Sequence, residues 1–402
     1  MDLEITTQVV LLGGLMAVVL GAVANRTNFC AMGAVSDWVN LQDTGRIRSW
    51  ILAMAVAILG VSLLEAWSLL DPDTSRIPYR RSLFFWPRYV FGGLMFGVGM
   101  TLASGCGNKN LVRIGEGNLK SILVVLVTGA MAYVMTWTDF YAVVFHSWME
   151  PISPDIARFG FEDQSLGTLL GTLAGIAEPG TLNLYLGVLL FCLLLFLVFR
   201  SREFRSGFDL ILGGVVVGLV VVGGWYVTGG PLGQEWMEAV DFMDEPPPGT
   251  GTQSYTFINP MNETLIYLWS PANIQLITFG VAGLFGVIAG SLLYALYSGR
   301  FRIVWFADVR DFVNHMIGAV LMGTGGVLAM GCTIGQGVTG VSTLALGSFV
   351  AMVFIILGSA LTLRVEYYRL VYEDQASFLK ALTAALVDLR LLPERLRKLE
   401  AV

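Results

Sequence analysis

Apolar runs long enough to cross a lipid bilayer recur along nearly the whole sequence. A spanning helix needs about 20 such residues. Nine runs approach this length, and they lie near 7–24, 50–70, 88–104, 119–137, 182–199, 208–228, 272–297, 312–330 and 341–363. Only 13% of the 402 residues are charged, whereas a soluble chain carries roughly 25%. We therefore predict an all-α polytopic membrane protein with about nine spanning helices, and a soluble enzyme is excluded.

Charge and motif content exclude further classes. The formal net charge is -6, so the chain has no broad basic surface for nucleic acid. The four cysteines form no C-x-x-C pair, and His146 and His315 lack partners at the spacing of metal ligands. The sequence also contains no Gly-x-x-x-x-Gly-Lys-Ser/Thr loop for ATP. We expect no metal and no cofactor.

Short segments that follow apolar runs predict re-entrant half-helices. The segments at 31–40, 107–117 and 333–340 are marked by glycine and are too short to span a bilayer. The stretch 165–178 is apolar but also too short, and its position stays open.

The distribution of arginine predicts the orientation in the membrane. Two longer polar segments, 138–164 and 229–270, are acidic, and the second contains no Lys or Arg. Arginines follow three spans, at Arg200, Arg202, Arg205, Arg300, Arg302, Arg310, Arg364 and Arg369. Cytoplasmic ends are rich in such residues, so we predict a periplasmic N-terminus and a cytoplasmic C-terminus. Four arginines fall on the outer side in this tracing and disagree with it: Arg76, Arg80, Arg81 and Arg88.

The C-terminal tail differs in composition from the rest. Apolar residues recur at helical spacing over 374–400, among basic residues that include Lys380, Arg395 and Lys398. This pattern predicts an amphipathic helix on the cytoplasmic membrane surface, and docking of a partner is the alternative. We expect a transport domain at 1–365 and a tail at 366–402.

One pattern of glycines before a cysteine occurs in each half of the chain. Residues from Gly97 to Cys106 and from Gly323 to Cys332 align without a gap as Gly-x-Gly-x-x-Leu-Ala-x-Gly-Cys. An odd number of predicted spans separates the copies, so they should have opposite orientations, as in the inverted repeats of transporters. The repeats are expected to cover about 1–165 and 182–365, with a site between them.

The two Gly-Cys pairs lie where a spanning helix is predicted to break. Gly105 and Gly331 allow the backbone to turn and approach closely, and the free N–H groups of a broken helix attract an anion. The thiols of Cys106 and Cys332 are soft, weak donors that suit a sulfur atom of a substrate. We predict that both line a central pathway.

The remaining cysteines are less well supported by the repeat. Cys30 ends the first span in the same way, but the matching position in the second half is expected near Gly230, so both a pathway role and a packing role stay open. Cys192 lies inside an apolar run and is predicted to be a packing residue without a role.

Charged residues follow the first Gly-Cys pair. Asn108 and Lys109 come directly after it, with Arg113 one turn further on. A cation inside the membrane needs a partner or an aqueous path, which an anion pathway supplies. The alternative, equally open for Arg26, is that these side chains extend to the cytoplasmic interface.

Three cysteine motifs are specific enough for comparison with known proteins. They are Asn28-Phe29-Cys30, Ser104-Gly105-Cys106-Gly107-Asn108-Lys109 with Arg113-x-Gly115-x-Gly117-Asn118, and Met330-Gly331-Cys332-Thr333-Ile334-Gly335-Gln336-Gly337. Together they resemble the YeeE/YedE family of membrane proteins. The likeness extends to about residue 365 and excludes the tail.

The resemblance implies a function and a set of residues. It implies an hourglass-shaped transporter of the bacterial inner membrane that takes up thiosulfate, with Cys30, Cys106 and Cys332 along the pathway. Asn108, Lys109 and Gln336 lie in the same motifs and are expected to line it. Other sulfur or selenium compounds are carried by some relatives, and some relatives work with a TusA-like sulfur carrier, which this chain does not contain.

Two other classes of function stay open at this stage. A membrane sulfurtransferase or redox protein would need a low-pKa thiolate near a cation, and Cys106 with Lys109 is the candidate. A scaffold that docks a soluble partner through the tail would leave the repeated cysteines unexplained. We therefore predict a transporter and not an enzyme.

Overall fold

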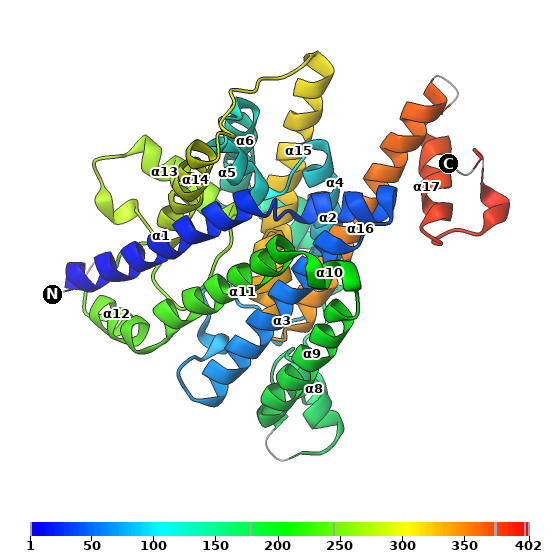
Figure 1. The fold of residues 1–402 in the computed structure, drawn as a ribbon. Helices are drawn as coiled ribbons and strands as arrows, with labels where there is room; N and C mark the ends of the chain where they lie inside the picture. Colours follow the sequence, from blue (N-terminus) through cyan, green and yellow to red (C-terminus); the bar gives the residue numbers. More distant parts are fainter. Residues whose placement is uncertain (1, 177–178, 244–245, 374–375, 398, 401–402) are drawn as a thin grey trace.

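The computed structural model describes residues 2–176, 179–243, 246–373, 376–397 and 399–400, and within these ranges the chain is helical with no strand. Figure 1 shows long helices that cross one another around the centre of the molecule. Eight segments are long and apolar enough to cross a membrane. The long helices are α1 (Asp2–Arg26), α3 (Gly45–Ala66), α4 (Gly93–Leu102) with the π-turn Arg88–Gly92 before it, α6 (Leu119–Trp137), α9 (Leu182–Phe199), α11 (Phe208–Gly229), α14 (Phe279–Tyr297), α15 (Val309–Leu328) and α16 (Leu346–Tyr372). The prediction of an all-α, multi-pass membrane protein is confirmed.

Each predicted apolar run corresponds to one of these helices, although some boundaries differ. α15 is not among the eight apolar segments, because it begins with polar residues that include Arg310 and Asp311. α14 begins at Phe279 and not near residue 272, because Ile274–Leu276 forms a separate 3-10 turn. The open stretch 165–178 contains α8 (Leu166–Leu173), which packs on α9.

The predicted half-helices are present as short helical segments. They are α2 (Ala31–Ser36) with the π-turn Asp37–Leu41, α5 (Gly107–Gly115), and the π-helical turn η8 (Gly335–Gly340). Each begins close to a cysteine, and all but the end of the first are buried in the core.

The second acidic segment is not the simple outer loop that its composition predicts. It contains α12 (Pro231–Asp241) and α13 (Ile258–Trp269), joined by a stretch in which Thr252 to Phe257 are buried. The polar groups of this stretch bind neighbouring backbone: the Ser254 hydroxyl donates to Val221 O at 2.7 Å, and the Tyr255 hydroxyl donates to Gly13 O at 2.6 Å. Asp244 and Glu245 of the same segment lie outside the described residues. Polarity here reflects internal hydrogen bonds and not exposure to water.

Glycines form a close seam between α4 and α15. A Cβ atom on Gly99 would lie 2.7 Å from Gly318 O, and one on Gly92 would lie 2.9 Å from Gly325 O. Gly92 precedes Gly99, whereas Gly325 follows Gly318, so the two helices run antiparallel. The backbones approach this closely because no side chain stands between them.

Helices of the first half pack on helices of the second half, and the two sets of contacts form an exchange of partners. Gly97 of α4 packs on α16 at Ser359, and Gly323 of α15 packs on α6 at Thr128. In the same way α1 packs along α14 while α11 packs along α3. Such an exchange is the pattern that a two-fold axis imposes on related elements.

The four outer arginines that disagreed with the charge pattern are largely explained by folding contacts. Arg80 is buried and binds Glu65 through two hydrogen bonds of 2.6 and 2.8 Å. Arg88 donates to Leu328 O and Val327 O at the C-terminal end of α15, where free carbonyls favour a cation. Arg81 remains exposed. Bonded arginines of this kind serve the fold and carry little information about orientation.

The tail helix is shorter than predicted. α17 spans Phe378–Asp388 and ends before Pro393, and Lys398 lies outside the described residues. Its alanines face α16, and the Tyr368 hydroxyl of α16 donates to Asp388 at 2.9 Å. Figure 1 shows α17 beside the end of α16, at the edge of the molecule.

Candidate functional site

The three predicted pathway cysteines share one local geometry. Cys30 and Cys106 are the N-cap residues of α2 and α5, and Cys332 stands directly before the helical run that begins at Thr333 and leads into η8. The Cys30 sulfur accepts a hydrogen bond from Gly33 N at 3.4 Å, and the Cys332 sulfur accepts one from Gly335 N at 3.4 Å. Cys106 occupies the same position without a capping hydrogen bond, so sulfur caps the helical segment only at Cys30 and Cys332. Sulfur here takes the capping position that a hydroxyl or carboxylate usually occupies.

The residue before each Gly-Cys pair, and not the glycine of the pair, makes the turn that ends the helix. Ser104 and Met330 adopt left-handed backbone angles, with φ of 56° and 58°. The following glycine N–H groups donate to Met100 O and Gly326 O, both at 2.8 Å, which closes the helix end as a Schellman turn does. The prediction that the glycines make the turn is therefore wrong.

The glycines instead allow close packing. A Cβ on Gly105 would lie 3.3 Å from Lys109 Cγ, and one on Gly331 would lie 3.2 Å from Gly335 C. These separations are below the usual contact distance of about 3.5–4.0 Å. Both positions keep the first turn of the following segment close to the cysteine.

The folded chain brings the cysteines together. Cys106 and Cys332 are fully buried, Cys30 is 4% exposed, and none forms a disulfide. The Cys30 thiol lies close enough to the Cys106 thiol to interact with it. Cys106 also faces the hydroxyl of Thr333, the residue after Cys332. Cys30 and Cys106 thus form a buried pair, and Cys332 lies in the same core, directly before Thr333.

Gly230 caps α12 as Cys30 caps α2, but the packing of the short helices offers a second counterpart of Cys30. Gly230 ends α11 and is followed by α12. The element that matches α2 is α13, because α2 packs on α3, α4 and α16 while α13 packs on α14, α15 and α6. Phe257 is the N-cap residue of α13, and Thr256 and Phe257 approach Cys332 as Cys30 approaches Cys106.

The two cations near Cys30, Lys109 and Arg26, differ in burial. Lys109 is 7% exposed, and its ammonium donates to Asn28 Oδ1 at 2.9 Å and lies 3.8 Å from Glu116. Because it is buried and bonded, Lys109 does not extend to the interface. Arg26 does so: it is half-exposed and pairs with Asp209 at 3.1 Å.

The two predicted amides have different environments. The Gln336 amide nitrogen donates to Ala329 O, which ties η8 to the end of α15. Asn108 is 1% exposed, and its Oδ1 has no hydrogen-bond partner among the described residues. Gln336 therefore holds the segments in place through its nitrogen, and both amide oxygens, Gln336 Oε1 and Asn108 Oδ1, lack a hydrogen-bond partner among the described residues.

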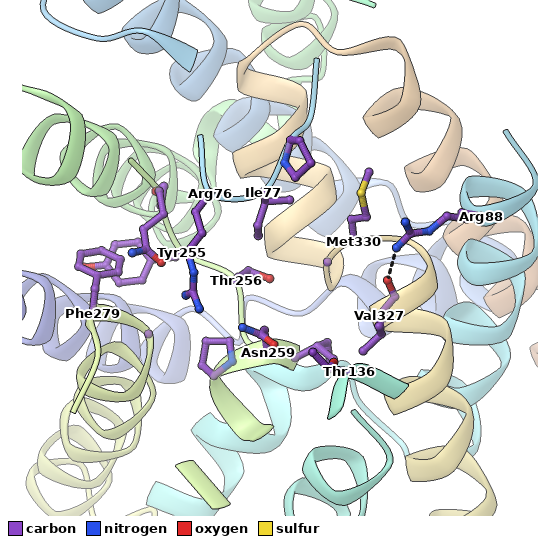
Figure 2. A pocket seen from close by; sticks show the side chains of 18 residues that line it. Arg76, Ile77, Arg88, Thr136, Tyr255, Thr256, Asn259, Phe279, Val327 and Met330 are labelled. Atoms are coloured by element: carbon purple, nitrogen blue, oxygen red, sulfur yellow. Dashed lines mark hydrogen bonds between the residues drawn. The ribbon is translucent and has the colours of Figure 1, made fainter. Parts of the chain in front are cut away.

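A cavity of about 290 Å³ opens beside the second Gly-Cys pair. Figure 2 shows Arg76 and Arg88 on opposite sides of it, with Thr256 and Met330 between them. Gly331 also lines this cavity, so the space reaches the residue next to Cys332. The guanidinium group of Arg76 is paired with the Glu263 carboxylate at 2.8 Å.

Sequence reasoning missed the contribution of two segments to this site. Tyr79 comes from the connection between α3 and α4, and its hydroxyl donates to Gly335 O at 3.0 Å. Thr256 comes from the acidic segment. The signal in the sequence is the absence of Lys and Arg from 229–270, which fits an outer loop as well as a buried segment.

Cys192 is predicted to be a packing residue without a role, and the structure places it outside the core. It is exposed on α9, between the exposed Leu189 and Leu193. Within the described ranges no group of three or more His, Cys, Asp or Glu side chains is placed to bind a metal.

Antiparallel spanning helices, with buried free cysteines where helices break, define the class of polytopic membrane transport proteins. The chain belongs to the family described as Sulphur transport, which matches residues 26–361. This membership confirms the resemblance found in the cysteine motifs, and it places the chain among transport proteins and not among enzymes.

Two relatives match over nearly their whole length. The chain is 24% identical over 370 residues to the thiosulfate transporter TsuA of Escherichia coli strain K12, covering 87% of this chain and 92% of that protein. It is 24% identical over 374 residues to the thiosulfate transporter TsuA of Spirochaeta thermophila, covering 86% of this chain and 96% of that protein.

Proposed function

We propose that this protein carries thiosulfate across the bacterial inner membrane into the cytoplasm, along the row formed by Cys332, Cys106 and Cys30. The observation that carries the proposal is that these three free cysteines are buried and lie where broken helices begin. The names of both relatives support thiosulfate as the substrate.

The chemistry of the site fits this anion. Thiosulfate has one soft terminal sulfur and three hard oxygens, so thiols and backbone N–H groups together distinguish its two ends. Arg76 and Arg88 line the cavity beside Gly331, and Lys109 is bonded to Asn28, near Cys30. A dianion therefore meets compensating positive charge before and after the neutral thiols.

We further propose that residues 1–365 form two inverted repeats, at about 1–165 and 182–365, with the N-terminus periplasmic and the tail at 366–402 cytoplasmic. The antiparallel seam of α4 and α15 and the exchange of packing partners support the repeats. The arginines that follow α9, α14 and α16 support the orientation.

Transport by the protein alone is the direct test. Purified protein in liposomes should take up labelled thiosulfate, and Cys106→Ala or Cys332→Ala should abolish uptake without loss of folded protein. Cys192→Ala is the matched control, because that thiol is exposed and distant in the sequence from the row. Undiminished uptake by both core variants would contradict the pathway.

A TusA-like sulfur carrier is the proposed partner on the cytoplasmic side. It would accept the sulfur that the transporter delivers, so adding it should raise net uptake without being required for entry. If liposomes took up label only when the carrier was present, and a persulfide appeared on Cys106, sulfur transfer would replace transport as the function.

A further inference from the structure

Two buried threonine hydroxyls in the core have no hydrogen-bond partner among the described residues. They belong to Thr256, which is 9% exposed, and to Thr333, which is fully buried. Nearby buried threonines do form bonds: Thr339 donates to Tyr255 O and Thr343 donates to Gly340 O, both at 2.7 Å. An unpaired buried hydroxyl costs about 1–3 kcal/mol, so a pair of them calls for an explanation.

Each unpaired hydroxyl stands beside a thiol of the proposed pathway. The Thr256 hydroxyl lies against Gly335, whose N–H donates to the Cys332 sulfur at 3.4 Å, and Thr333, which faces Cys106, directly follows Cys332. Thr256 also lines the cavity that contains Arg76, and Figure 2 shows its side chain between Arg76 and Met330. The core therefore offers the same combination twice, a hard O–H donor next to a soft S–H donor.

We propose that Thr256 and Thr333 are specificity-determining residues that donate hydrogen bonds to the oxygens of the transported anion, while Cys332 and Cys106 contact its sulfur. This inference rests on the proposed function and deepens it. The anion occupies two successive stations, Thr256 with Cys332 and then Thr333 with Cys106. At each of these two positions an oxygen of the anion accepts the hydrogen bond for which the protein supplies no acceptor.

The arrangement selects for an anion with two chemically different ends. Charged oxygens accept hydrogen bonds from hydroxyls more strongly than sulfur does, and the thiol contributes a polarizable contact. An anion with oxygens alone leaves the thiol without its sulfur contact. An anion with sulfur alone leaves the hydroxyl unpaired.

Isosteric variants separate this role from a structural one. Thr256→Val and Thr333→Val remove the hydroxyl and keep the shape, whereas Thr256→Ser and Thr333→Ser keep a hydroxyl. The readouts are the KM for labelled thiosulfate in liposomes and the Tm in detergent. The valine variants should raise KM roughly tenfold each, the value for one lost bond to a charged acceptor, and the serine variants should stay near wild type.

The change in Tm distinguishes an anion-binding hydroxyl from a structural one, because the two roles predict changes of opposite sign. Thr256→Val and Thr333→Val should keep or raise the Tm, because each removes an unpaired buried polar atom. Thr339→Val is the matched control and should lower the Tm, because it leaves the Tyr255 carbonyl without its donor. An unchanged KM in both valine variants, or a fall in Tm equal to that of the control, would overturn the inference.

Failure of this inference is distinguishable from failure of the proposed function. If wild-type protein takes up no thiosulfate, the proposed function fails. If Cys106→Ala and Cys332→Ala lose uptake while the valine variants keep the wild-type KM, the pathway stands and the role of the hydroxyls falls.

Discussion

Replacing Gly97 or Gly323 by alanine should destabilise the protein by similar amounts, because the two glycines make equivalent contacts in the two halves. A Cβ on Gly97 would lie 2.8 Å from Ser359 N, and one on Gly323 would lie 2.6 Å from Thr128 O and 2.8 Å from Met131 Cβ. Carbon contacts are optimal near 3.5–4.0 Å. Since the blocking atoms are mostly backbone, a helix must shift, and such overpacking costs about 1–3 kcal/mol.

Thermal unfolding in detergent measures this effect. Both variants should lose several degrees of Tm, on the scale of about 2–4 °C per kcal/mol for a domain of 150–250 residues. Gly105→Ala is the control, because the nearest atoms are on the flexible Lys109 side chain, at 3.3 and 3.4 Å. An unchanged Tm in Gly97→Ala or Gly323→Ala, or a large fall in only one of them, would refute the equivalence of the halves.

Three further outcomes are expected. Lys109→Ala should reduce thiosulfate uptake at least several-fold per folded molecule while Arg26→Ala leaves it unchanged, because only the first side chain is buried beside the thiols; equal effects would remove Lys109 from the pathway. Burial raises the pKa of Asp73, in the connection after α3, to about 6, so the folded state loses stability as pH rises from about 4 to 6; Asp73→Asn should therefore gain Tm relative to wild type above pH 6 and not near pH 4, and a gain that does not depend on pH would contradict this. Arg397→Ala should expose α17 to limited proteolysis with uptake retained, since the bond to Asp388 at 2.8 Å is lost; unchanged cleavage would show that packing on α16 alone holds the tail.

The long helices were predictable because the membrane imposes a length and an apolar composition on each one. Boundaries failed where polar residues have partners inside the protein. The stretch from Thr252 to Phe257 is polar in sequence but buried, and its hydroxyls bind backbone on distant helices. A count of charges cannot distinguish such a segment from one that faces water, because the difference lies in which groups it bonds.

The cysteine site was predictable only in part. Repetition of a motif identified Cys106 and Cys332, and both are in the core. It could not identify the contact of Cys30 with Cys106, because Cys30 lies outside the repeated pattern. Thr256 carries no motif, and only the fold brings it to Cys332.

The seam between α4 and α15 restricts how the protein can move during transport. Gly92 meets Gly325 and Gly99 meets Gly318 with backbone against backbone, and these helices lead directly to Cys106 and Cys332. A rocking motion of one half against the other would separate these surfaces and remove packing that no side chain can restore. Rotation of thiols, hydroxyls and the Lys109 side chain leaves the seam intact. The glycines that hold the halves together therefore keep the crossing of α4 and α15 fixed. The ion passes by small local displacements of side chains around this crossing.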